Sequence, residues 1–255
     1  MLKFKRIYID ADRPLDDIKK DLTDAGSHEG AVLIGDDLVY REDCMKVVED
    51  VKSAGYKRIR IQGTGHRLHE AGFAEDLISA GVFQYEIELS SFNADVAQIF
   101  NTIRTFEGYG QPGFSPYLAA RISVTKNNHA QIGDIVRMVL QCRTDRITLF
   151  FDDYDVKMSE VIPYLSMAIE TGLLTQVWIQ TENLPLCLMA GYEHHVSELY
   201  MEDEWERKHV PACSKCVYKE SCEGIEVEYI KMHGDAEFKA VLKSGYAKEM
   251  VGLRR

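Results

Sequence analysis

The sequence predicts an α/β fold, a parallel partial (β/α)6-type barrel with a cysteine-rich metal-binding extension after it. Three observations lead to this prediction. Short apolar segments alternate with amphipathic ones, the turns between them are short and rich in Gly or Asp, and the alternation stops near Thr181, after which the cysteines cluster. Such alternation is typical of a parallel sheet with right-handed helical crossovers, open or closed into a barrel.

The predicted strands are short runs of β-branched and aromatic residues that end at Gly or at a polar residue. In a parallel sheet the functional side chains belong at the carboxyl ends of the strands, and here these ends are polar and rich in carboxylates. We expect about six of the strands to form one barrel sheet. The candidates are residues 4–10, 31–34, 57–62, 83–89, 117–125, 147–151 and 176–180.

Between the strands, apolar residues recur every three to four positions, which places them on one face of a helix. Pro14 opens the first of these helices. Cys44 and Cys142 lie on such apolar faces, so we predict that they are core residues and not ligands. The predicted helices are 14–22, 41–54, 73–79, 94–106, a segment that starts at Asn128, 158–170, and a short tail helix from Asp235.

We predict two parts, a barrel over residues 1–181 and a cysteine-rich segment over residues 182–255. With 255 residues, 45% of them apolar, the chain can bury one large core and a small appended module. The net charge of −11 argues against a nucleic acid or an anionic membrane as partner. The N-terminus shows no leader-like pattern and no apolar run approaches about 18 residues, so we expect a cytoplasmic protein.

The cysteine-rich segment carries the most specific pattern in the chain. Cys213, Cys216 and Cys222 follow the spacing C-x2-C-x5-C, and Cys187 lies upstream. A C-x2-C turn points two thiolates into one pocket, Cys222 can close that pocket, and Cys187 is a credible fourth ligand. Disulfides are disfavoured in the cytoplasm, so a metal site is the main prediction and buried free thiols are the plain alternative.

Two metal centres suit these cysteines. A [4Fe–4S] cluster takes four thiolates, and a tetrahedral zinc site takes four Cys or three Cys and one His. His209 could replace Cys187 in such a zinc site. His194 and His195 follow Cys187 in the chain and are candidates for a ligand or a proton donor, although a polar loop pair is the plainer interpretation.

The order of the elements, with Cys187, the run from Cys213 to Gly224 and residues 229–237, resembles the radical S-adenosylmethionine enzymes that carry a SPASM or twitch extension with auxiliary iron–sulfur clusters. Segments 54–65, 77–82, 85–89 and 122–127 match more weakly, and the resemblance covers nearly the whole chain. It implies one auxiliary [4Fe–4S] cluster on Cys187, Cys213, Cys216 and Cys222.

The chain departs from that family at the catalytic cluster. The family binds this cluster through C-x3-C-x2-C after the first strand, whereas no cysteine precedes Cys44 here. Gly35, Asp36 and Asp37 stand at the turn that in the family holds the amino group of S-adenosylmethionine. The resemblance thus implies an accessory, electron-transfer or substrate-binding subunit, partnered by a radical S-adenosylmethionine enzyme or by a peptide or protein substrate, that does not cleave the cofactor by itself.

Two other classes of protein stay open. Zinc on the same residues would make the chain a noncatalytic scaffold or binding module. Alternatively, carboxylates at the strand ends could hold a hard divalent cation or form a general acid–base pair, which would make it an enzyme of a different kind. Those carboxylates are Asp36, Asp37, Glu88, Asp152, Asp153 and Asp155.

Overall fold

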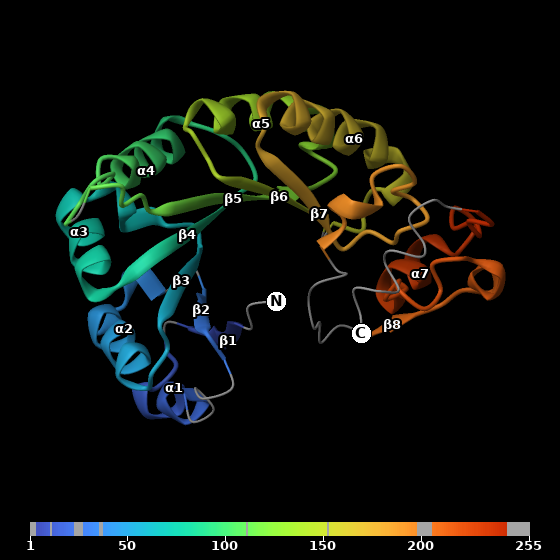
Figure 1. The fold of residues 1–255 in the computed structure, drawn as a ribbon. Coiled ribbons are helices and arrows are strands. Elements are labelled where there is room, and N and C mark those ends of the chain that lie inside the picture. Colours follow the sequence, from blue (N-terminus) through green and yellow to red (C-terminus); the bar gives the residue numbers. More distant parts are fainter. Residues whose placement is uncertain are drawn as a thin grey trace. The chain divides into compact units, whose positions relative to one another are not determined.

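The computed structural model describes residues 4–10, 12–22, 28–35, 38–110, 112–151, 153–197 and 206–243 (Figure 1). Strands and helices alternate along this part of the chain, and the strands form a seven-stranded sheet in sequential order. The predicted α/β class, a partial (β/α) barrel, is confirmed, with seven strands where about six were expected. The strands are β1 Phe4–Tyr8, β2 Gly30–Ile34, β3 Arg58–Gly63, β4 Val82–Leu89, β5 Tyr117–Val124, β6 Arg146–Phe151 and β7 Trp178–Glu182.

Alternating burial fixes the register of the first four strands, which pair in parallel. On β3, Ile61 is buried while Arg60 and Gln62 beside it are partly exposed. Ile61 pairs with Leu33 of β2 and with Tyr85 of β4, which are also buried. A slip by one residue would turn these apolar side chains to the opposite face of the sheet, so their burial selects this register.

The helices bury the apolar faces that their sequences predict. On α2, Cys44 is buried together with Val47, Val48 and Val51, and Cys142 is buried as well, so both cysteines are core residues as predicted. Within the described ranges, no helix is long and apolar enough to cross a membrane. The helices are α1 Leu15–Asp21, α2 Cys44–Ser53, α3 Ala71–Ala80, α4 Ala94–Arg104, α5 Ile132–Gln141, α6 Met158–Thr175 and α7 Val227–His233.

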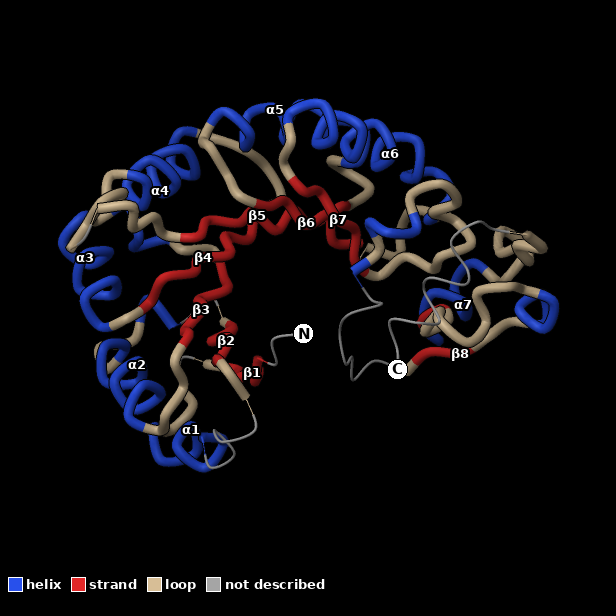
Figure 2. The backbone as a smooth tube through the Cα atoms, in the orientation of Figure 1, coloured by secondary structure: helices blue, strands red, loops and turns tan. Residues whose placement is uncertain are grey.

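The chain divides into two compact units. The first comprises Met1–Arg121 and Met138–Arg146. In it, helices α1 to α4 lie on one side of strands β1 to β4 (Figure 2). Buried apolar residues such as Ile59 and Ile87 alternate along these strands with polar ones, so the apolar residues form one face and the polar residues the other.

The second unit comprises Ile122–Arg137 and Ile147–Arg255, and it contains both β7 and the cysteine-rich segment. Its helix α6 has no side-chain cap from Lys157 at its start. Instead, the Met158 N–H donates to the Tyr229 hydroxyl at 2.8 Å and the Ser159 N–H donates to the Glu237 carboxylate at 2.9 Å. The tail thus supplies the cap of a barrel helix. The predicted boundary after residue 181 stays a prediction.

The tail folds differently from our expectation. A short antiparallel pair, β8 Arg207–Lys208 with β9 Ile225–Glu226, leads directly into α7. The helix predicted from Asp235 is wrong, because α7 ends at His233 and residues 235–243 are not helical. Gly234 at φ +71° and ψ −162° ends the helix one residue before the predicted start.

Candidate metal centre

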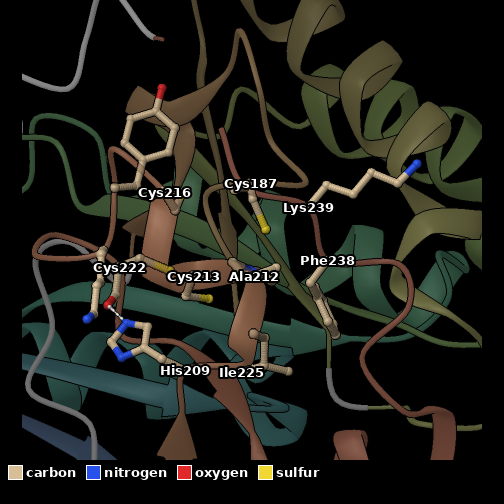
Figure 3. Close-up of a pocket in the computed structure, with 13 residues that line it drawn as sticks. Cys187, His209, Ala212, Cys213, Cys216, Cys222, Ile225, Phe238 and Lys239 are labelled. Atoms are coloured by element: carbon tan, nitrogen blue, oxygen red, sulfur yellow. Dashed lines mark hydrogen bonds between the residues drawn. The ribbon is translucent and has the colours of Figure 1, made fainter. Parts of the chain in front are cut away.

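The four predicted cysteine ligands line one cavity in the second unit (Figure 3). Cys187 comes from the loop that follows β7. Cys213 lies in the short 3-10 helix Pro211–Lys215, Cys216 follows that helix directly, and Cys222 lies farther along the same segment. The structure therefore brings the C-x2-C-x5-C triplet and the distant Cys187 to one cavity, while their role as metal ligands stays a prediction.

Successive backbone turns hold the three tail cysteines. The Cys213 N–H donates to the Val210 carbonyl at 2.9 Å, and the Cys216 N–H donates to the Cys213 carbonyl at 3.1 Å. The Cys222 N–H donates to the Tyr218 carbonyl at 2.8 Å. Because the backbone satisfies its own hydrogen bonds, the thiol groups are left to face the cavity.

Gly224 completes the turn that carries Cys222. Its N–H donates to the Cys222 sulfur at 3.4 Å. Gly224 has φ +97°, and a Cβ atom at this position would lie 2.7 Å from the Lys208 carbonyl oxygen. Only glycine fits here, because both the backbone angle and the approach to β8 exclude a side chain.

The pKa of Cys187 depends on the three other thiols of the cavity. Burial raises the pKa of Cys187 to about 12, and the neighbouring thiols of Cys222, Cys216 and Cys213 add to the increase. Four thiolates in one cavity repel each other unless a positive centre lies among them. The ionised form of all four cysteines together would therefore need a cationic partner.

The rest of the cavity wall contains both basic and apolar side chains. His209, Lys219 and Lys239 belong to the lining, together with Ile225 and Phe238. The Nε2 atom of His209 lies 3.1 Å from the Cys222 carbonyl oxygen. His209 is therefore placed beside the cysteines, and it remains the candidate for the histidine of a zinc site.

The two consecutive histidines lie elsewhere. His195 stacks on Trp178, with ring centroids 4.5 Å apart, and its Nδ1 atom is 2.6 Å from the Ile179 carbonyl oxygen. Neither His194 nor His195 is among the residues that line the cavity. Packing against β7 accounts for His195, in agreement with the plainer interpretation of the pair.

The glycine of the predicted cofactor turn has a structural role. Gly35 follows β2 with φ +150°, and a Cβ atom there would lie 2.1 Å from the Ile9 carbonyl oxygen. Its N–H donates to the Gln62 carbonyl oxygen at 3.0 Å. The contact with Ile9 is enough to require glycine. Asp36 and Asp37, the other two residues of this turn, lie outside the described residues.

Two of the predicted strand-end carboxylates, Glu88 and Asp153, are engaged by other groups. Glu88 accepts a hydrogen bond from Gln62 at 2.8 Å and lies 3.3 Å from Arg121. Asp153 accepts from the backbone N–H groups of Lys126 and Asp155, as a turn residue does. Asp152 lies outside the described residues. Among all the residues that the structure describes, the four cysteines of the cavity included, no group of three or more His, Cys, Asp or Glu side chains is arranged to hold a metal ion.

Sequence reasoning missed two buried groups. Tyr218 lines the cysteine cavity and donates a hydrogen bond to Glu193, which also accepts from the Gly191 N–H at 3.0 Å. In the first unit, Glu86 on β4 is enclosed by arginines. The sequence did contain a signal for Glu86 and its arginines, because charged residues alternate with apolar ones in β3 and β4. Nothing in the sequence links Tyr218 to Glu193.

The fold and this site together define an α/β protein of the partial (β/α)-barrel type with a four-cysteine cavity. No protein-family model and no curated protein matches the sequence. Among solved structures, SuiB from Streptococcus suis, solved bound to S-adenosylmethionine, is similar, with a TM-score of 0.52 at 13% identity. The match covers 79% of this chain and 50% of SuiB, so the chain spans half the length of that protein.

A second similar structure is 3-dehydroquinate dehydratase from Enterococcus faecalis. The match covers 93% of this chain and 95% of that protein, at 10% identity. Its TM-score of 0.47 is too low to carry an argument. The likeness to SuiB shows the fold alone.

Proposed function

We propose that the chain is a radical-S-adenosylmethionine-like iron–sulfur protein with one auxiliary [4Fe–4S] cluster on Cys187, Cys213, Cys216 and Cys222. The observation that carries this proposal is the shared cavity, in which the ionisation of Cys187 is linked to that of the other three thiols. When bound, a cluster with four thiolate ligands would supply one-electron transfer and structural stability. The donor set matches that cluster in number and in chemistry.

The proposed role is that of an accessory, electron-transfer or substrate-binding subunit. No cysteine precedes Cys44, and Cys44 is buried in the core, so the chain has no C-x3-C-x2-C motif for a cluster that cleaves S-adenosylmethionine. The likeness of fold to SuiB supports a place among proteins of that architecture. The partner is a radical S-adenosylmethionine enzyme, or a peptide or protein that such an enzyme modifies.

Metal analysis of protein purified without oxygen tests the site. We expect about four iron and four sulfide per chain and a broad visible absorption band, as a single cubane cluster requires. Replacing Cys187, Cys213, Cys216 or Cys222 with Ala should remove most of the iron. Cys142→Ala is the matched control, because Cys142 is a buried thiol outside the cavity, and it should retain full iron content. Full iron in all four cavity variants would reject the ligand assignment.

A structural zinc site is the second candidate, and the position of His209 favours it. Because His209 lines the cavity, three of the cysteines and this imidazole could form a tetrahedral site. About one zinc per colourless chain, lost in His209→Ala, would establish this alternative and make the protein a scaffold or binding module. Iron content that His209→Ala leaves unchanged would instead support four thiolate ligands.

A further inference from the structure

Three arginines of the first unit gather around one buried carboxylate. Arg60 of β3 lies 3.5 Å from Glu86 of β4, and Arg146, the first residue of β6, donates to the same carboxylate at 3.0 Å. Arg121 of β5 pairs with Glu88 at 3.3 Å. We call Arg60, Arg121 and Arg146 the guanidinium cluster. It belongs to the polar face of the strands, opposite the apolar residues that pack under the helices.

The charges of Arg60, Arg146 and Glu86 do not cancel. The two arginines carry two positive charges and share the single negative charge of Glu86, which leaves a surplus of one among these three residues. Burial by itself raises the pKa of Glu86, but Arg146, Arg60 and Arg121 outweigh it, so the net shift is downward and Glu86 is ionised at neutral pH. A cationic surplus stands out in a chain with a net charge of −11.

In the described part of the chain, Arg60 and Arg146 use few of their hydrogen-bond donors. A guanidinium group has five N–H donors. Among the described residues, Arg60 donates to Gln84 at 3.1 Å and to Glu86, and Arg146 donates to Glu86 alone. The Nε atom of Arg146 is buried without a partner. A buried donor that stays unpaired destabilises the protein, so this region can gain free energy from one more acceptor.

The cluster is accessible although it is largely buried. The side chains of Arg60, Arg121 and Arg146 are 19%, 14% and 20% exposed. Burial also lowers the pKa of Arg60, which means that the environment opposes its charge. Partly desolvated guanidinium groups bind carboxylates and phosphates strongly, because the N–H fork matches two oxygens of the anion.

We propose that the guanidinium cluster binds an oxyanion, the carboxylate or phosphate group of a small ligand, on this face of the sheet. The residues that carry the inference belong to the first unit, whereas the four cysteines belong to the second. The proposed anion site is therefore independent of the proposed iron–sulfur cluster. An experiment that rejects one of these two proposals does not bear on the other.

Calorimetric titration of the full chain with malonate and with inorganic phosphate at low ionic strength tests the site. We expect at least one of the two anions to bind, and the tighter binder identifies the ligand as a carboxylate or a phosphate. In the double variant Arg146→Gln with Glu86→Gln, which removes a cation together with its partner, binding should weaken about tenfold or more. Arg143→Gln should bind as the wild type does, since Arg143 is 65% exposed and pairs with Glu107.

Two further measurements test the proposal if the double variant does not fold. Arg121→Gln removes a cation that pairs with Glu88, a residue whose side chain is 34% exposed, and it should also weaken binding. In the wild type, the side-chain Nε–H resonances of the cluster should shift on titration in an NMR spectrum. Wild-type protein that binds neither anion, or folded cluster variants that bind as tightly as the wild type, would overturn the proposal.

Discussion

Glu237, in the segment after α7, accepts a hydrogen bond from the backbone N–H of Ser159 in the first turn of α6, at 2.9 Å. Glu237 also accepts from Tyr229, whose hydroxyl in turn accepts the Met158 N–H. A carboxylate at a helix N-terminus satisfies orphan N–H groups and interacts favourably with the helix dipole. The cysteine-rich tail is thus joined to a barrel helix by polar contacts as well as by packing.

Glu237→Ala should destabilise the protein by about 1–2 kcal/mol, the usual effect of losing a helix cap. Thermal or urea unfolding measures the change. Glu228→Ala is the control, because Glu228 is an exposed residue of α7 that pairs with the exposed Lys231. The control should change the free energy of unfolding by no more than about 0.5 kcal/mol. Equal effects of the two substitutions would argue against the cap.

Gly224→Ala should disrupt the cysteine turn, because a methyl group would collide with the Lys208 carbonyl. We expect lower metal content and a loss of stability above the roughly 1–3 kcal/mol that a positive φ costs a residue with a side chain. Gly191→Ala is the matched control. Gly191 has φ +90°, but its Cβ would meet nothing within 4 Å, so only the backbone strain applies. A Gly224→Ala protein with full metal content would contradict the assigned role of the turn.

Glu86 should make the stability of the protein depend on pH in the acid range. Its pKa in the folded protein lies below the ordinary value of 4.5, so the folded state binds fewer protons than the unfolded state. The stabilisation is fully present above that value and is lost as the pH falls through the folded pKa. Melting temperatures measured against pH should fall less steeply in Glu86→Gln than in the wild type. Parallel curves would show that Glu86 is not the group responsible.

Reduced protein should not cleave S-adenosylmethionine when it is assayed alone. The reaction needs a cluster with one open iron, and the cysteines that could hold it at the first strand are absent. Analysis for 5′-deoxyadenosine after incubation with a strong reductant and S-adenosylmethionine provides the test. A stoichiometric or larger yield, above that of a protein-free control, would contradict the proposed accessory role.

The sequence by itself determined the secondary-structure elements and the local turns that carry the three tail cysteines. Apolar periodicity depends on residues a few positions apart, so it predicted the sheet strands and the burial of Cys44 and Cys142. The same locality explains the tail cysteines, since Cys213 and Cys216 are held by hydrogen bonds within a few residues. The local pattern gave a wrong prediction at Asp235, where a helix was expected but the chain after Gly234 is not helical.

Only the tertiary structure decided how distant segments meet. It brings Cys187 to the cavity of the other three cysteines, while His195 packs on Trp178 instead. It also places Arg146 beside Glu86, although sixty positions separate them in the chain. These contacts depend on which strands become neighbours and on the register in which they pair. Such long-range choices follow from packing the whole core, and no local pattern of residues encodes them.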